Sequence, residues 1–304
     1  MIPKISALAF PYSDSTGEGF GLPLLNCEMV PLFSLYSPRY WMFIQAEEHD
    51  VIRMDPRHWY YDDETYQYYV ERLASLSARA VLVFDSPFTY EKPVYFPDRL
   101  FEDFVARRAE ILYNEFKKRN SKAKLISPAV SGGIGEENEH RTVAFLVNHH
   151  SLFDAIAVHC FGELAQRELA HLSKLLGNVL SPAPKPVWVT HWCVSAGSSV
   201  SKRPKGSGYL PLPMDEAARR LIDSYRTIDI MCHGKTVWFY AGLAGDIYAP
   251  ELRSPSDYAD PRRAFEITKG RGGLKEWDAF HFLGLISTEG IVKDEICKAL
   301  KSLE

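Results

Sequence analysis

The chain is poor in cysteine and has no long apolar run. Its 304 residues contain five cysteines, none of which forms a Cys-x-x-Cys pair, so neither a disulfide framework nor a zinc knuckle is expected. No segment approaches the roughly 20 apolar residues of a membrane span. The apolar stretch at residues 5–10 is too short for the core of a secretory signal. We therefore expect reduced, mostly buried thiols and no membrane partner, and these absences favour a cytoplasmic location.

A strong charge of one sign is also missing. Lys and Arg number 35 against 39 Asp and Glu, which gives a formal net charge of -4, and the isoelectric point is near 6.2. This balance argues against nucleic acid as a partner. No glycine-rich nucleotide or phosphate fingerprint follows the first apolar segment. We expect no cofactor, and the sequence leaves the oligomeric state open.

The most informative stretch is residues 185–192, which read Lys-Pro-Val-Trp-Val-Thr-His-Trp. β-branched and aromatic residues dominate it, and these favour a pleated, buried strand. A short continuous apolar run of this kind is typical of a central parallel strand that is covered on both faces. His191 lies where this strand should end, and functional residues of parallel α/β folds gather at the carboxyl ends of the strands.

Segments with strand and helix patterns alternate along the chain, which indicates parallel βαβ units. We predict α/β class and a single (β/α)8 TIM barrel that spans residues 1–304. A doubly wound open sheet is the alternative. The expected strands fall at residues 5–10, 30–35, 51–54, 80–84, 123–130, 154–159, 185–192 and 236–241. The expected helices fall at residues 63–76, 98–118, 163–176, 215–225 and 294–303, and residues 142–147 are expected to lie within another helix.

Several motifs, taken in order, resemble those of one family. Residues 84–87 read Phe-Asp-Ser-Pro, residues 153–161 read Phe-Asp-Ala-Ile-Ala-Val-His-Cys-Phe, and residues 282–286 read Phe-Leu-Gly-Leu-Ile. Together with residues 120–128 and 185–192, they resemble the large clan of retaining glycoside hydrolases built on (β/α)8 barrels. The resemblance implies that Ser86 and His191 stand where that clan carries its acid/base and nucleophile glutamates.

Retaining hydrolysis needs two carboxyl groups about 5–5.5 Å apart. Neither a serine nor an imidazole replaces that pair, so the resemblance implies a glycoside-hydrolase-like protein that binds an oligo- or polysaccharide without the standard catalytic groups. Its cleft would lie at the carboxyl ends of the strands. The residues expected to line it are His159, Phe161, His191, Trp192, Trp238 and Tyr240.

Three alternatives stay open. An active glycosidase would use relocated carboxylates, and the best pair is Asp85 with Glu163. A metal site would take His159, His191 and Asp85 as ligands, because nitrogen and oxygen donors at strand ends suit zinc. A structural or assembly barrel would fill the cleft with its own chain, from residues 195–213 or 242–277.

Aromatic residues crowd one short polar stretch, residues 59–69. Tyrosine and tryptophan combine an apolar ring with a polar tip, which suits sugar binding. The spacing of Tyr66, Tyr69, Val70 and Leu73 instead follows one face of a helix and predicts packing against the core. Sugar binding by part of this stretch stays open, and packing of the helix face is the favoured interpretation.

Overall fold

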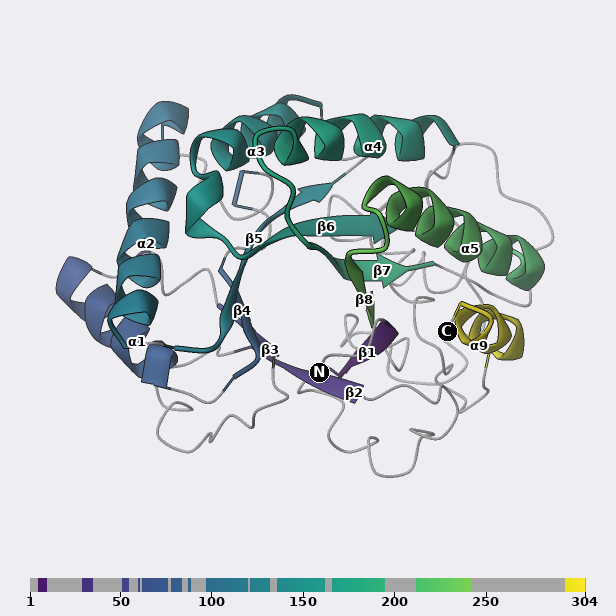
Figure 1. Ribbon diagram of the computed structural model, residues 1–304, viewed down its shortest axis with the longest axis horizontal. Coiled ribbons are helices and arrows are strands. Elements are labelled where there is room, and N and C mark those ends of the chain that lie inside the picture. The colour runs from purple at the N-terminus through teal and green to yellow at the C-terminus, as the bar shows by residue number, and fades with distance from the viewer. Residues whose placement is uncertain are drawn as a thin grey trace, which may run out of the picture.

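The computed structural model describes residues 5–9, 29–34, 51–54, 60, 62–75, 78–83, 87–88, 97–119, 121–131, 136–161, 166–194, 212–241 and 293–303. Eight parallel strands follow one another in chain order, and β1 pairs with β8 to close a barrel (Figure 1). The strands are β1 (Ile5–Ala9), β2 (Met29–Ser34), β3 (Val51–Arg53), β4 (Ala80–Leu82), β5 (Lys124–Ser131), β6 (Ala155–Phe161), β7 (Val187–Cys193) and β8 (Thr236–Ala241).

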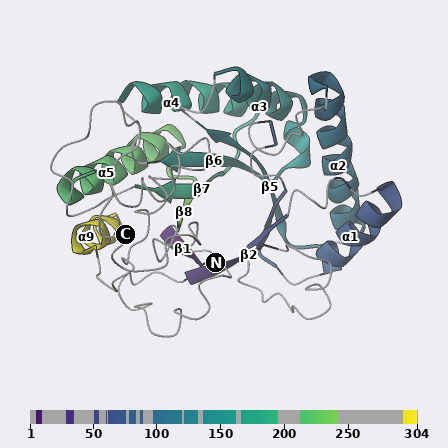
Figure 2. The same ribbon diagram turned by 180° about the vertical axis from the view of Figure 1, so that it is seen from behind.

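A helix follows each strand from β3 to β8 and lies outside the barrel. In Figure 1 these helices run from α1 and α2 on the left, over α3 and α4 at the top, to α5 and α9 on the right, and Figure 2 shows the same ring from behind. The helices are α1 (Asp63–Ser75), α2 (Asp98–Lys118), α3 (Glu136–Asn148), α4 (Gln166–Leu180), α5 (Met214–Met231) and α9 (Asp294–Lys301), and a 3-10 turn, η5 (His150–Leu152), precedes β6.

The predicted α/β class with a parallel sheet is confirmed. Residues 10–28 and 35–50, where a helix after β1 and a helix after β2 would fall, lie outside the described residues. A full set of eight strand–helix units in one domain therefore stays a prediction. Residues 142–147 lie in a helix as predicted, and this helix, α3, extends from Glu136 to Asn148.

Side chains of the barrel wall alternate between two apolar layers, as expected for strands with a two-residue period. On β6, Ile156 and Val158 belong to the large cluster that includes residues of the surrounding helices. Ala155 and Ala157 belong to a smaller cluster, and we take this cluster as the barrel interior because its described members come from strands β3 to β7 and from no helix. Its members are Val51, Ala80, Leu82, Ile126, Ala129, Ala155, Ala157 and Trp188, with Val237 of β8 packed against it.

Strand β5 carries an extra residue at Ser127-Pro128. Ile126 pairs with Ala155 and Ala129 pairs with Ala157, so three steps on β5 match two on β6. A bulge accommodates proline in a strand because proline has no N–H to donate. The Ser127 hydroxyl replaces a backbone carbonyl as hydrogen-bond acceptor at this point of the sheet, because the Ala157 N–H donates to Ser127 Oγ at 3.0 Å.

Replacing Ser127 with alanine is expected to lower the free energy of unfolding by about 1–3 kcal/mol, because it leaves the buried Ala157 N–H without an acceptor. Urea unfolding of both proteins measures the difference. Ser151→Ala is the control, since Ser151 is exposed. An unchanged midpoint for Ser127→Ala would show that water or another group satisfies this amide.

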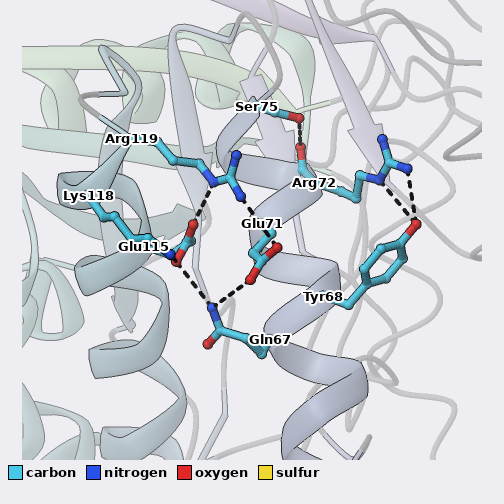
Figure 3. A network of polar contacts seen from close by, with 8 residues as sticks. All are labelled: Gln67, Tyr68, Glu71, Arg72, Ser75, Glu115, Lys118 and Arg119. Carbon is cyan, nitrogen blue, oxygen red and sulfur yellow. Dashed lines mark hydrogen bonds and ion pairs between the residues drawn. The ribbon is translucent and has the colours of Figure 1, made fainter.

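Helices α1 and α2 are joined by a polar network around Glu115, which is 4% exposed (Figure 3). Gln67 Nε2 donates to Glu115 Oε2 at 3.1 Å, and Arg119 Nε donates to Glu115 Oε1 at 2.5 Å. Arg119 also reaches Glu71 at 3.4 Å. Burial alone raises the pKa of Glu115, but hydrogen bonds and charges from Arg119 and Lys118 outweigh it, so the pKa lies below its ordinary value of 4.5.

Because the pKa of Glu115 is lower in the folded than in the unfolded protein, its ionised carboxylate stabilises the fold at pH values above the unfolded-state pKa. This stabilisation is lost as the pH falls through the lower pKa of the folded protein. Glu115→Gln is therefore expected to cost about 1–2 kcal/mol at pH 7, through weaker bonds to charged donors. The difference from the unmodified protein should shrink below about pH 4.5. Urea unfolding at several pH values measures this. Glu110→Gln, at an exposed position of the same helix, should show neither effect.

Candidate functional site

Two histidines meet at the carboxyl ends of neighbouring strands. His159 of β6 and His191 of β7 are register partners, and their ring centroids lie 4.3 Å apart with an interplanar angle of 65°. His159 is 5% exposed, whereas His191 is partly exposed. Chemistry in a parallel barrel takes place at this end of the strands, so the histidine pair defines the candidate site.

A bulge in β7 gives His191 its direction. Val158 pairs with Val189 and His159 pairs with His191, so Thr190 is an extra residue on β7. Trp188 belongs to the interior cluster. Strict alternation from Trp188 would turn the His191 side chain towards the helices. Because Thr190 is an extra residue, the side chains that follow it change faces. His191 therefore shares the inner side with Trp188 and with His159, which continues the inward row of Ala155 and Ala157.

Ser131 adds a third polar side chain at the same level. It ends β5 and is the register partner of His159. Ala129 is an interior residue and Val130 faces the helices, so alternation turns Ser131 inward. Its side chain is 9% exposed. Ser131, His159 and His191, which we call the polar row, thus lie side by side on three adjacent strands.

Trp192 and Trp238 do not line the proposed site, which corrects the sequence-based prediction. Both are fully buried, and their rings lie 4.8 Å apart in the layer between the barrel and α5. Trp192 Nε1 donates to Ser224 Oγ of α5 at 3.0 Å. Trp238 Nε1 donates to Thr236 Oγ1 at 2.8 Å. The bulge at Thr190 explains why the Trp192 side chain faces α5, because unbroken alternation would place it on the same side of the strand as Trp188.

The remaining predicted site residues are only partly described. Phe161 and Cys193 pair at the ends of β6 and β7, and Tyr240 of β8 pairs with Trp192. The side chains of Phe161 and Tyr240 lie outside the described part of the chain. Asp85, Ser86 and Glu163 also lie outside it. The catalytic pair Asp85 and Glu163 therefore stays a prediction.

The aromatic stretch before and within α1 is divided between core and surface. Tyr66 and Tyr69 are buried in the main core, as the helical spacing predicted. Tyr68 is 58% exposed, and its hydroxyl accepts hydrogen bonds from Arg72 Nε and Nη2 at 3.1 Å (Figure 3). Tyr60 stacks on Phe104 of α2, with ring centroids 5.7 Å apart.

Neither a metal cluster nor a membrane helix is found in the part of the chain that the structure describes. Within those ranges, no three or more His, Cys, Asp and Glu residues are placed to hold a metal ion together. No helix in them combines the length and apolar character needed to cross a membrane.

The thiols of Cys160, Cys232 and Cys297 are free and buried, as predicted for these three.

Comparisons with known proteins identify the fold. Residues 105–208 match the family model described as glycosyl hydrolase catalytic core. A glycosylated endo-β-1,4-xylanase of glycoside hydrolase family 10 from Gloeophyllum trabeum aligns with a TM-score of 0.57 and 13% identity, over 98% of this chain and 96% of the xylanase. The GH53 catalytic domain from Ignisphaera aggregans aligns with a TM-score of 0.51 and 12% identity, over 83% of this chain and 73% of that domain. No curated protein matches the sequence. The chain therefore has a glycoside hydrolase-like (β/α)8 fold.

Proposed function

We propose that this chain is a carbohydrate-binding protein, built on a glycoside hydrolase-like barrel that has lost the standard retaining catalytic pair. The site would lie at the carboxyl ends of the strands, and one domain would span residues 1–304. The glycoside hydrolase-like fold supports the sugar-binding part of this proposal. The resemblance of β7 supports the loss of catalysis, because His191 stands where the nucleophile glutamate is expected.

The observation that carries the proposal is the contact between His159 and His191, whose ring centroids are 4.3 Å apart. A retaining enzyme needs a carboxylate to attack the anomeric carbon and stabilise an oxocarbenium-like transition state. A neutral imidazole has no negative charge to offer. Its ring nitrogens do supply a hydrogen-bond donor and an acceptor, which are the groups that bind sugar hydroxyls.

A glycan array, followed by a hydrolysis assay on each bound glycan, tests the proposal. Binding without turnover is the expected result. His191→Ala should weaken binding about tenfold, which is the typical effect of one lost hydrogen bond of roughly 1–1.5 kcal/mol. His140→Ala is the matched control, because His140 lies exposed on α3.

Two other outcomes would overturn the proposal. Turnover that survives His191→Ala but is lost in Asp85→Asn or Glu163→Gln would establish a glycosidase with relocated carboxylates. No binding to any glycan would instead leave a barrel retained for structure or assembly.

A further inference from the structure

A buried histidine lies at the opposite end of the barrel from the candidate site. His150 begins η5, the turn that leads into β6 at the amino-terminal end of the strands, and it is 9% exposed. Its Nε2 atom is shielded from solvent and has no hydrogen-bond partner among the described residues. The adjacent His149 differs, because it is partly exposed and its ring stacks on Phe145 of α3, with centroids 4.8 Å apart. A neutral imidazole carries a proton on one nitrogen only, so the closed turn accommodates a neutral His150 ring whose Nε2 is unprotonated.

The charges around His150 oppose its protonation. Lys185, which lies two residues before β7, is the charged group that acts on the ring directly, by repulsion between cations. The position of this lysine is fixed, because Lys185 Nζ donates to the carbonyl oxygen of Phe153. Asp154, immediately before β6, and Lys117 of α2 act in turn on Lys185. A proton on His150 would therefore add a second cation beside Lys185.

The surroundings of His150 change its affinity for a proton. Burial lowers the pKa of His150 below its ordinary value of 6.5, and the charge of Lys185 lowers it further, while a hydrogen bond with the Ala183 backbone partly opposes both. Once the turn opens into water, the pKa of His150 returns to about 6.5. The open form then binds a proton more readily, so the closed form loses stability as the pH falls from about 6.5 through the lower pKa of the closed form.

Two sets of hydrogen bonds join the turn to the neighbouring strands. The Asp154 N–H donates to the carbonyl of Leu125 on β5 at 2.8 Å, and the Leu125 N–H donates to Asp154 Oδ2 at 2.9 Å. The other is the bond from Lys185 to Phe153. A protonated His150 would bury an Nε2–H without an acceptor and repel Lys185. The bond from Lys185 to Phe153 is therefore the contact that protonation weakens most directly.

We infer that η5 is an acid-sensitive latch: protonation of His150 repels Lys185 and releases residues 149–154 from the amino-terminal end of the barrel. Histidine suits this role because its charge changes between pH 5 and 8. The inference does not depend on the proposed sugar binding, since His159 lies at the other end of β6. The pH range also separates the latch from the Glu115 network, whose contribution is lost only below about pH 4.5.

Hydrogen–deuterium exchange on the full chain at pH 7.5 and 5.5 tests the latch. After correction for intrinsic rates, exchange of the Leu152 and Asp154 amides should increase about threefold to tenfold at pH 5.5, the range set by one proton at one pH unit below 6.5. Amides of α1, whose sequence contains no histidine, should not change. Exchange of the histidine Cε1 hydrogens, resolved by peptide fragmentation, should show that His150 binds its proton below pH 6.5.

His150→Gln should abolish the increase, and Lys185→Gln, which removes the charge and keeps a hydrogen-bond donor, should reduce it. His140→Gln, at an exposed position of α3, is the control and should leave it intact. Thermal melting confirms that each variant folds. The latch is overturned if Leu152 and Asp154 exchange equally at both pH values, if the increase survives His150→Gln, or if His150 in the unmodified protein binds its proton at pH 6.5 or above. That last measurement needs no variant, so it tests the latch even where a variant does not fold.

Discussion

Replacing Trp188 with alanine is expected to lower the free energy of unfolding by about 3–5 kcal/mol, the usual cost of truncating a buried tryptophan. Trp188 is 1% exposed and lies in the barrel interior. A barrel of this kind is commonly filled by layers of large branched side chains. Among the eight described residues of the interior cluster, four are alanines, at positions 80, 129, 155 and 157. One indole therefore fills space that several branched residues would otherwise occupy.

Urea unfolding of the purified variant measures this effect, and two further variants test its origin. Trp188→Phe should cost less than Trp188→Ala, because most of the ring volume remains. Tyr68→Ala removes an aromatic ring that is 58% exposed and should change the free energy by no more than about 0.5 kcal/mol. A loss below 1 kcal/mol for Trp188→Ala would mean that neighbouring side chains collapse into the space, and that the indole is not needed to fill the barrel interior.

The strands were the part of the fold that the sequence predicted best. In short apolar runs such as residues 187–190, both faces of the strand are buried, and burial on both faces leaves little choice of conformation. Helix ends were less certain. The sequence predicted a helix at residues 215–225, but α5 extends from Met214 to Met231, because its final turns pack on the barrel through residues such as Ile228. Tertiary packing of this kind adds turns that local pattern does not indicate.

The candidate site depends on a detail that alternation alone could not supply. Predicting which residues of β7 face inward requires knowing that Thr190 is an extra residue, and this is visible only when β7 is paired with β6 and β8. The sequence-based prediction placed both His191 and Trp192 in the cleft, although neighbouring residues of a strand point to opposite faces, and the hydrogen bond of Trp192 to Ser224 of α5 was missed. Ser131 was also missed, because a single serine at a strand end carries no pattern of its own.

Alkylation of Cys160 in the folded protein is expected to be at least about a thousandfold slower than in the unfolded protein at pH 8. Burial raises the pKa of the Cys160 thiol from 9.0 to about 12, although a hydrogen bond with Ser224 partly opposes the increase. Only the thiolate reacts, and this change in pKa alone reduces the thiolate population about a thousandfold. Iodoacetamide labelling followed by site-resolved mass spectrometry measures the rate.

This measurement also tests the orientation on which the candidate site depends. Cys160 follows His159 directly on β6, so the two side chains point to opposite faces of the barrel wall. If Cys160 is shielded beneath α5, His159 must face the barrel interior and can meet His191. Ser151→Cys provides an exposed thiol on the same chain, which should react at the rate of a free cysteine. Rapid labelling of Cys160 at a rate similar to that reporter would place Cys160 towards solvent and His159 towards the helices, and the polar row would then not exist.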